Sequence, residues 1–552
     1  MNKIIISLLL LTSVAVKVYS QPKNKQKDRI PVNWEFQAAD GKYIGASIEK
    51  AYEYIQEQGI EKKKEIVVAV IEGGVDLQHE DIKNVLWVNE DEIPGNGIDD
   101  DKNGYIDDVN GWNFLGNVNG KNLVKSSLEA DREFFRLINE FEQYGIDSTQ
   151  VPIKQMDEYL YFRYKVIKNS KIGKAYESNE AMKSIVAYAD TFTIAMQLKY
   201  NTAKTNFSFD QFNSISPAET ESINKLRAFI YYAMGFGFKK RTHGADANWN
   251  HMLESRQRLT EKTQTSYDKL LAEGLYNRDI IGDDINNIKD KYYGNNNIDA
   301  THTDHGTHVA GIIGADRNNK LGMKGVADVK LMNIRAIPEG DEYDKDVALA
   351  ILYAVDNGAN IINLSFGKPI STNKKWVDKA LKKAEKKGVL IVHAAGNSYQ
   401  NIDEDYIYPV KYITTKKVLT NFITIGSVNA YGNPAITSNY GATAVDVFAP
   451  GVDIYSTIVG DNYKKMNGTS MAAPVVTGIA ALVWSYFPDL SVQELIEVLR
   501  KGVTNMTGKE VEKPKDPKMM IPRKKIAFEE ICSWNGIINA YNAIKLAHEL
   551  QQ

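Results

Sequence analysis

The stretch Asn467–Pro474 combines a nucleophile with the start of a helix. It reads Asn-Gly-Thr-Ser-Met-Ala-Ala-Pro, and the apolar run Val475–Val483 that follows has the spacing of a buried helix with Ser470 at its N-terminus. Free backbone N–H groups and the positive end of the helix dipole would stabilise an oxyanion formed when this hydroxyl attacks a carbonyl. Taken alone, Ser470 is better explained as an N-cap, so a hydrolase interpretation depends on partners elsewhere in the chain.

Two other stretches carry side chains that hydrolases use. Glu72 follows the β-branched run Ile66–Ile71, and the carboxyl end of a parallel strand is where such sheets place their sites. Glu72 alone would also suit a solvated loop. His305 stands at the start of a helix rich in small residues, with His308 three positions later. No third ligand of matching type lies nearby, so this pair does not predict zinc.

The segment Gly97–Asp108 contains the first half of a calcium loop of the EF type. Such loops place hard oxygen ligands at alternate positions, then a glycine for the sharp turn and a backbone carbonyl ligand. Asn110 stands where the loop has its twelfth-position glutamate, and an acidic turn without an ion is the alternative. We predict a structural calcium ion, because clustered carboxylates repel one another without a cation. The predicted ligands are Asp99, Asp101, Asn103 and the Tyr105 carbonyl, with Asp107 or Asp108 completing the shell.

The elements that would position these residues alternate between apolar strands and helices. Short β-branched runs flanked by glycine favour strands that are buried on both faces. The predicted fold class is therefore α/β, with a doubly wound, mainly parallel sheet. The predicted strands are residues 65–71, 330–336, 361–366, 389–393 and 422–428.

Residues 116–280 differ in character from the rest of the chain. They are rich in Tyr, Lys and Glu and poor in β-branched runs, and they predict an insertion of four to six helices. No repeat and no chemical motif stands out within them. The helical patterns cover Leu128–Tyr144, Met156–Ile172, Asn179–Tyr200, Ala218–Met234 and Trp249–Leu271.

Composition limits the location and the partners of the protein. The chain has 552 residues and a net charge of −3, which excludes a global attraction to nucleic acid or anionic lipid. Residues 1–20 predict a secretory signal peptide, because their apolar core is too short for a good membrane anchor. No later stretch predicts a membrane span after cleavage, so we expect export to the periplasm or the extracellular space. Cys532 is the single cysteine, which excludes an internal disulfide.

Four blocks occur in one order along the chain: the strand ending in Glu72, then His-Gly-Thr-His-Val-Ala-Gly, Ala-Ala-Gly-Asn and Gly-Thr-Ser-Met-Ala-Ala-Pro. This set resembles the subtilisin-like serine proteases, the subtilase or peptidase S8 family. The resemblance covers residues 33–114 and 280–550 and leaves the helical insertion outside it. It implies a three-layer α/β/α fold and an exported serine endopeptidase whose partners are polypeptide substrates.

The resemblance also implies a role for each matching residue. Ser470 would be the nucleophile, His305 the general base, and Asn397 the side-chain donor to the oxyanion. The strand Ser365-Phe366-Gly367 would pair with the substrate backbone, and Phe366 and the residues near Ala394–Asn397 would line the first pocket.

The acid of the triad maps to Glu72, where the family has aspartate. Glutamate has the same charge but reaches about 1.5 Å further. Ser-His-Glu triads work on other folds, so we expect activity, reduced by a site shaped for aspartate. The alternative is a catalytically impaired subtilase fold that serves as a binding protein. Glu72 favours that alternative, whereas intact His305, Asn397 and Ser470 favour the enzyme.

Overall fold

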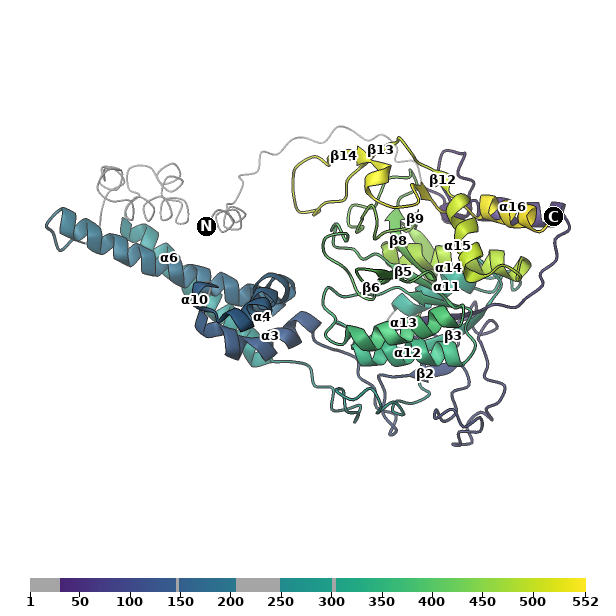
Figure 1. Cartoon of the computed structure of the whole chain (residues 1–552), viewed down its shortest axis with the longest axis horizontal. Coiled ribbons are helices and arrows are strands. Elements are labelled where there is room, and N and C mark those ends of the chain that lie inside the picture. Colours follow the sequence, from purple (N-terminus) through teal and green to yellow (C-terminus); the bar gives the residue numbers. More distant parts are fainter. Residues whose placement is uncertain (1–29, 145–147, 205–248, 300–303) are drawn as a thin grey trace. The chain divides into compact units, whose positions relative to one another are not determined.

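The computed structural model describes residues 30–144, 148–204, 249–299 and 304–552 (Figure 1). The signal peptide predicted over residues 1–20 lies outside them, as does the helical pattern at 218–234. The chain divides into two compact units. Among the described residues, the larger unit contains 30–129 and Tyr276–Gln552, and the smaller unit lies between Ala130 and Leu275.

A nine-stranded sheet forms the centre of the larger unit, in the order β12-β15-β9-β8-β5-β4-β1-β3-β2. Every neighbouring pair is parallel except β12 with β15. The predicted parallel sheet is thus confirmed, and the five predicted strands lie side by side as β8, β5, β4, β1 and β3. The strands are β1 (Val67–Glu72), β2 (Gly111–Asn113), β3 (Lys330–Arg335), β4 (Ile361–Leu364), β5 (Leu390–Ala394), β8 (Phe422–Val428), β9 (Val447–Pro450), β12 (Thr504–Asn505) and β15 (Gly536–Ile537).

Alternate residues of the central strands face two different helical layers. In β1, Val68 and Val70 belong to one apolar cluster, whereas Ala69 and Ile71 belong to another. The first cluster includes residues of α2 (Ile48–Glu57), α11 (Asp304–Gly314), α14 (Thr469–Tyr486), α15 (Val492–Lys501) and α16 (Ala540–Leu550). The second includes residues of α12 (Asp344–Asp356) and α13 (Lys374–Lys386), which lie side by side in Figure 1. Continuous apolar strands therefore form the middle of a three-layer α/β/α unit.

Strand alternation also determines where Glu72 points. Side chains two residues apart share a face of a strand, so Glu72 lies on the same face as Val68 and Val70. That face packs against α11 and α14, the two helices that begin near His305 and Ser470.

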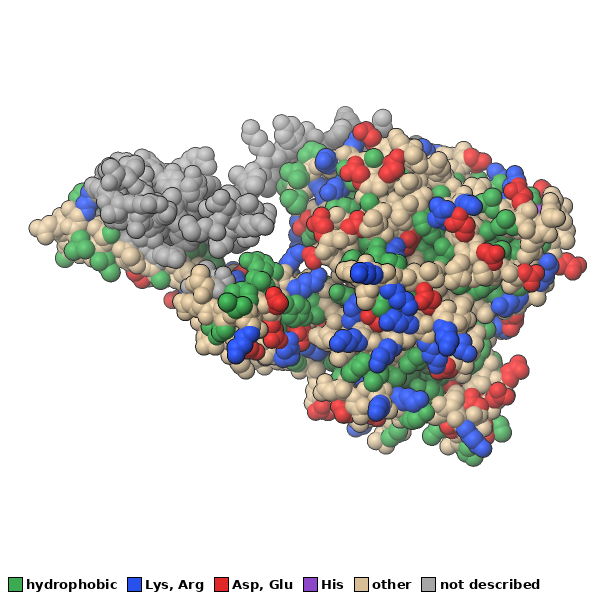
Figure 2. All heavy atoms as spheres, in the orientation of Figure 1, with side chains coloured by type: hydrophobic (Ala, Val, Ile, Leu, Met, Phe, Trp, Pro, Cys, Tyr) green, Lys and Arg blue, Asp and Glu red, His purple; other side chains and the backbone are tan. Residues whose placement is uncertain are grey.

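Three two-stranded sheets lie outside the central sheet in the described part of the chain. They are antiparallel and pair β6 (Tyr412–Thr414) with β7 (Lys417–Val418), β10 (Ile454–Ile458) with β11 (Asn462–Met466), and β13 (Glu510–Glu512) with β14 (Lys525–Ala527). The β10–β11 hairpin leads directly into α14. By length and composition α14 could cross a membrane, but it is 89% buried inside the larger unit. Acidic and basic side chains are interspersed over the visible face of this unit (Figure 2).

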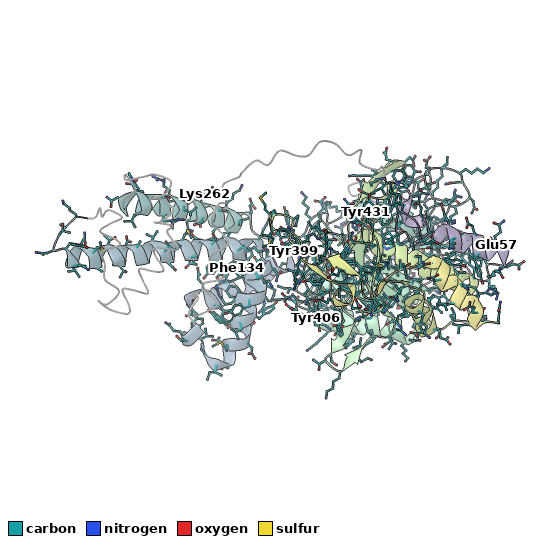
Figure 3. All side chains as sticks on the ribbon, turned by 90° about the horizontal axis from the view of Figure 1, so that it is seen from above. Glu57, Phe134, Lys262, Tyr399, Tyr406 and Tyr431 are labelled. Carbon is teal, nitrogen blue, oxygen red and sulfur yellow. The ribbon has the colours of Figure 1, made fainter. Side chains whose placement is uncertain are left out.

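The smaller unit is helical and has an aromatic core of its own. Phe134, labelled in Figure 3, lies 5.8 Å from Phe162 and 5.7 Å from Tyr176 between ring centroids. The two long helices run side by side, and Asn179 on one donates to Gln264 on the other at 2.8 Å. Its helices are α3 (Glu129–Phe141), α4 (Met156–Tyr161), α5 (Ile167–Asn169), α6 (Lys171–Lys199) and α10 (Trp249–Glu273), with a π-helical turn at Phe162–Val166.

The larger unit fixes the two points where the chain leaves it and re-enters it. The backbone N–H of Tyr276 donates to the hydroxyl of Ser127 at 2.9 Å, which joins the two ends. Next to the exit, Glu129 accepts a hydrogen bond from Lys368 Nζ at 3.0 Å, and the Lys368 side chain is only 2% exposed. Next to the entry, Arg278 forms two hydrogen bonds to Asp346, at 2.6 and 2.7 Å.

Candidate active site

Ser470 lies in the first turn of α14, as the sequence predicts. The turn into the helix requires Gly468, whose φ of 149° lies in a region that side chains rarely adopt. The Ser470 hydroxyl donates to the carbonyl oxygen of Ser365 at 3.0 Å, and the Ser365 hydroxyl donates to the carbonyl oxygen of Ser470 at 3.0 Å. A hydroxyl has one proton to donate, so in this structure that of Ser470 is directed to Ser365 and not to an imidazole.

His305 is brought to the end of β1 by the close approach of α11. Gly306 makes this approach feasible, because a Cβ at that position would clash with the Gly74 carbonyl oxygen and would lie 3.0 Å from Glu72 Cβ. A hydrogen bond from the Thr457 hydroxyl to the Thr307 carbonyl, at 2.7 Å, also holds α11 in place. His308 is buried and donates from Nε2 to the Lys464 carbonyl at 3.0 Å. Burial lowers the pKa of His308 to about 4, so it is a neutral structural residue.

The structure brings Glu72 and His305 together. Nδ1 of His305 donates to Oε2 of Glu72 at 2.9 Å, which leaves Nε2 as the second ring nitrogen. The His305 side chain is 33% exposed and that of Glu72 is 3% exposed. Burial of the imidazole acts to lower its pKa, but the charge and the hydrogen bond of Glu72 outweigh burial, and the pKa of His305 is raised above its ordinary value. The second carboxylate oxygen, Oε1, is buried and has no hydrogen-bond partner among the described residues.

Asn397 lies beside the N-terminus of α14 with one end of its amide fixed. The backbone N–H of Thr469 donates to Oδ1 of Asn397 at 3.0 Å. Because only the amide oxygen can accept this bond, the other atom of the side-chain amide is assigned as Nδ2. Asn397 is exposed to solvent, and Nδ2 lies 3.3 Å from the position that a Cβ at Gly468 would take. Thr469, which the sequence did not single out, also accepts from the Gly396 backbone N–H through its hydroxyl, at 3.0 Å. The amide nitrogen of Asn397 is a donor of the kind that can bind an oxyanion.

The segment Ser365–Gly367 follows β4 and runs along the start of α14. Two residues beneath it were not predicted from the sequence. Asn363 donates to the Ser365 hydroxyl at 2.9 Å, and buried His393 donates from Nε2 to the Phe366 carbonyl at 2.9 Å. Burial lowers the pKa of His393 to about 4, so the ring is neutral. These contacts fix the backbone of the segment, while Gly367 at its end is exposed.

The acidic loop brings together some of the predicted calcium ligands. One carboxylate oxygen each from Asp99, Asp101 and Glu92 lies within 4.8 Å of the others, a set of hard oxygens that suits calcium. Glu92 was missed because it precedes the EF-type pattern. Asp107 lies outside this group, and its carboxylate accepts the backbone N–H groups of residues 95–97 at 2.7 to 3.1 Å.

The remaining predicted ligands, Asn103, Tyr105 and Asp108, lie in the same loop. Asn103 Nδ2 donates to Asp101 at 3.0 Å and to Asp108 at 3.1 Å, while Asn103 Oδ1 accepts from the backbone N–H of Tyr105 at 2.8 Å. The ring of Tyr105 packs against Trp112 and Tyr353 in the core. In this arrangement Asn103 presents its amide nitrogen to the carboxylates.

Comparison with known proteins identifies the family. The model of the subtilase family, peptidase S8, matches residues 63–514. The chain therefore belongs to the subtilase family. It is 45% identical over 183 residues to the thermophilic serine proteinase of Bacillus sp. (strain AK1), a match that covers 33% of this chain and 42% of that protein. It is 38% identical over 205 residues to subtilisin DY of Bacillus licheniformis, covering 37% of this chain and 71% of that protein. The chain thus spans less than half of the length of the thermophilic proteinase.

Among solved structures, a protease from Pseudoalteromonas arctica PAMC 21717 is 28% identical, with a TM-score of 0.35 over 44% of this chain and 70% of that chain.

Proposed function

We propose that this protein is an exported serine endopeptidase that hydrolyses peptide bonds with Ser470, His305 and Glu72 as its triad. The contact between His305 Nδ1 and Glu72 Oε2, at 2.9 Å, is the observation that carries the proposal. It fixes the tautomer in which Nε2 carries the lone pair that a general base needs. The sequence resemblance and the family membership support the same roles.

The reaction would proceed by acyl transfer. The Ser470 hydroxyl releases its hydrogen bond to Ser365, gives its proton to His305 Nε2, and forms a C–O bond to the substrate carbonyl carbon. The oxyanion accepts from Asn397 Nδ2 and the Ser470 backbone N–H. The C–N bond then breaks as His305 returns the proton to the leaving amine. Water, deprotonated by the same imidazole, hydrolyses the acyl-enzyme.

The substrate would be a polypeptide in extended conformation. We propose that Ser365, Phe366 and Gly367 pair with its backbone as an antiparallel strand, next to Ser470. Gly367 is exposed, so its backbone groups are open to such a partner. The peptidase domain would comprise residues 33–114 and 280–550, with residues 116–280 as a helical insertion and residues 1–20 as a cleaved signal peptide.

We expect the glutamate to reduce activity relative to an aspartate at the same position. Glu72 Oε1 is buried without a partner in the described chain, and an unpaired buried acceptor is unfavourable by about 1–3 kcal/mol. That cost is present before and during proton transfer, so the expected loss of rate comes from the extra reach of glutamate, about 1.5 Å, in a site shaped for aspartate. Glu72→Asp is accordingly expected to raise turnover.

A structural calcium ion is proposed at the acidic loop, held by Asp99, Asp101 and Glu92 and by the Tyr105 carbonyl. Asn103 would contribute its carbonyl oxygen after rotation of its amide group. The ion would stabilise the loop against repulsion between carboxylates and would take no part in the reaction.

The alternative is a subtilase fold that binds polypeptides without cleaving them, which the unpaired Glu72 oxygen favours. A fluorophosphonate probe distinguishes the two, because it labels an activated serine and not an ordinary one. We expect labelling of the wild type at Ser470 together with hydrolysis of a casein substrate, and neither in Ser470→Ala. A folded wild type that is neither labelled nor active would overturn the proposed endopeptidase function.

A further inference from the structure

Helix α13 carries four lysines that the proposed reaction does not use, and we call them the lysine row. They are Lys375, Lys379, Lys382 and Lys386. Successive members are three or four residues apart, so all four fall within about 60° of the helix circumference. The opposite side of α13 holds its buried apolar side chains, among them Val377 and Leu381. The lysine row therefore lies on the outer side of the helix.

The lysine row has no acidic partner of its own. Among the residues that the structure describes, none of the four lysines forms an ion pair or donates a side-chain hydrogen bond. The flanking charges are already paired, as Lys374–Asp378 at 2.7 Å, Lys383–Asp356 at 2.5 Å and Lys417–Glu385 at 3.7 Å. Within the mixed charges of this face, basic side chains gather over α13 (Figure 2). Net positive charge is therefore concentrated on the row.

The row is unfavourable for the helix that carries it. Like charges four residues apart repel, and Lys375 with Lys379 is such a pair, as is Lys382 with Lys386. Lys375 also stands in the first turn, where the positive end of the helix dipole disfavours a cation, and this turn contains no acidic residue. A glutamate at one of these positions would turn the repulsion into attraction, so a merely solvated face needs no such row. An anionic ligand would relieve both effects.

The shape of the row indicates the kind of anion. Neighbouring lysines are about 5–6 Å apart at Cβ, and the row is about 16 Å long. α13 contains no arginine, and lysine presents a point charge without the planar geometry that arginine uses to bind one anion in a fixed orientation. A small anion can neutralise one or two of the lysines. A linear polymer with an acidic group on each repeating unit can lie along all four.

Other features of α13 distinguish between polyanions. A helix that lies on a membrane inserts its apolar face between the lipids. That face of α13 is occupied, because Val377 and Leu381 belong to the second apolar cluster of the larger unit. Trp376, the one aromatic residue of α13, packs against the same cluster, which leaves the row without a ring on which a base could stack. Of the polyanions that an exported protein meets, an acidic polysaccharide thus fits best.

We propose that the lysine row binds a linear acidic polysaccharide. The choice of a polysaccharide rests on the proposed export, whereas the binding itself does not depend on hydrolysis. α13 covers the face of the central sheet opposite to α11 and α14, the helices that carry His305 and Ser470. A polymer along the row therefore lies on the far side of the sheet and leaves the candidate active site open to a polypeptide.

The test measures the binding of fluorescein-labelled heparin, a linear polysaccharide with sulfate and carboxylate groups, to the full chain by fluorescence anisotropy. A fourfold variant replaces every lysine of the row by glutamine, which removes the charges and keeps good helix-forming residues. We expect its Kd to rise at least about tenfold, since each exposed ion pair is worth about 1.4- to 5-fold in affinity. Wild-type binding should weaken between about 0.1 and 1 M NaCl, where the Debye length falls from about 10 Å to about 3 Å.

The matched control makes the same change of charge at four exposed lysines outside α13. These are Lys83, Lys121, Lys509 and Lys518. Its Kd should stay within about twofold of the wild type, because the scattered charges cannot all reach one polymer chain within a Debye length of about 10 Å. Both variants should keep the wild-type melting temperature. If the fourfold variant does not fold, Lys379→Gln with Lys382→Gln should still raise the Kd at least about twofold.

Three results overturn the inference. One is a wild type that does not bind heparin at low salt, and another is an equal loss of affinity in the variant and its control. The third is tighter binding of duplex DNA or of phosphatidylserine vesicles than of heparin, since a polysaccharide is then the wrong ligand. A wild type that binds heparin through the row but shows neither fluorophosphonate labelling nor hydrolysis removes the proposed function alone and supports this inference.

Discussion

Replacing Glu72 by glutamine removes one charge from the site and keeps the length of the side chain. In the wild type the carboxylate lies 2.9 Å from His305 Nδ1, and the imidazole gains a positive charge in the transition state. Two unit charges about 4 Å apart attract by about 4 kcal/mol at an effective dielectric constant of about 20. The imidazole is 33% exposed, so solvent screens part of this energy, and we take about 2–4 kcal/mol. Glu72→Gln should therefore lower kcat about 30- to 1000-fold.

The same substitution has a signature in the pH profile. Glu72 raises the pKa of His305, and the proposed base must be neutral to accept the Ser470 proton. Activity thus rises with pH as His305 loses its proton, and this rise begins at a lower pH once the carboxylate is gone. The assay is kcat/KM for a peptide p-nitroanilide between pH 5 and 9, with active enzyme counted by fluorophosphonate labelling.

Glu65→Gln is the matched control, because it makes the same change at an exposed residue just before the opposite end of β1. It should leave both the rate and the profile unchanged, and Ser470→Ala gives the blank. The reasoning is refuted if Glu72→Gln retains the wild-type rate, or if its acid limb stays in place or moves to higher pH.

Three further outcomes are expected. Asn397→Ala should lower kcat by about 10²–10³ with little change in KM, and an unchanged kcat would exclude Asn397 from the oxyanion site. EDTA should lower the melting temperature of the wild type, and added calcium should restore it. In Glu92→Gln, the calcium concentration needed for half-maximal restoration of the melting temperature should be higher. A melting curve that EDTA does not change contradicts the calcium site. Lys368→Met should lower the free energy of unfolding by about 3–5 kcal/mol, because it removes the buried cation that pairs with the carboxylates of Glu129 and Asp344. Denaturant titration measures this, and Lys50→Met, at a half-exposed ion pair, should change stability by less than about 1 kcal/mol.

The central sheet could be predicted because its strands are buried on both faces. A run such as Val67–Ile71 has one interpretation when every side chain is apolar and the next elements are helical. The outer strands gave no such signal. β2 has three residues, and β12 and β15 have two each, too few for any periodicity. Their positions follow from pairing with strands far away in the sequence, which a local pattern does not contain.

The candidate site was predictable only in part, for the same reason. Ser470 and His305 stand in motifs, so their positions could be read from neighbouring residues. His393 carries no motif, and its place beneath the Ser365–Gly367 segment is seen only in the fold, where it donates to the Phe366 carbonyl at 2.9 Å. Glu92 precedes the calcium-like pattern and joins it only through folding of the loop.

The hydrogen bond between Tyr276 and Ser127 has a consequence for the history of the helical unit. Because the Tyr276 N–H and the Ser127 hydroxyl lie 2.9 Å apart, the larger unit accommodates the chain between these two residues as it would a surface loop. Loop-closure entropy grows only with the logarithm of length, by about 0.6 kcal/mol for each doubling. A helical unit with its own aromatic core could therefore enter a shorter ancestral loop, or be exchanged for another domain, at little expense in stability. Chimaeras joined at these two residues should keep the larger unit folded.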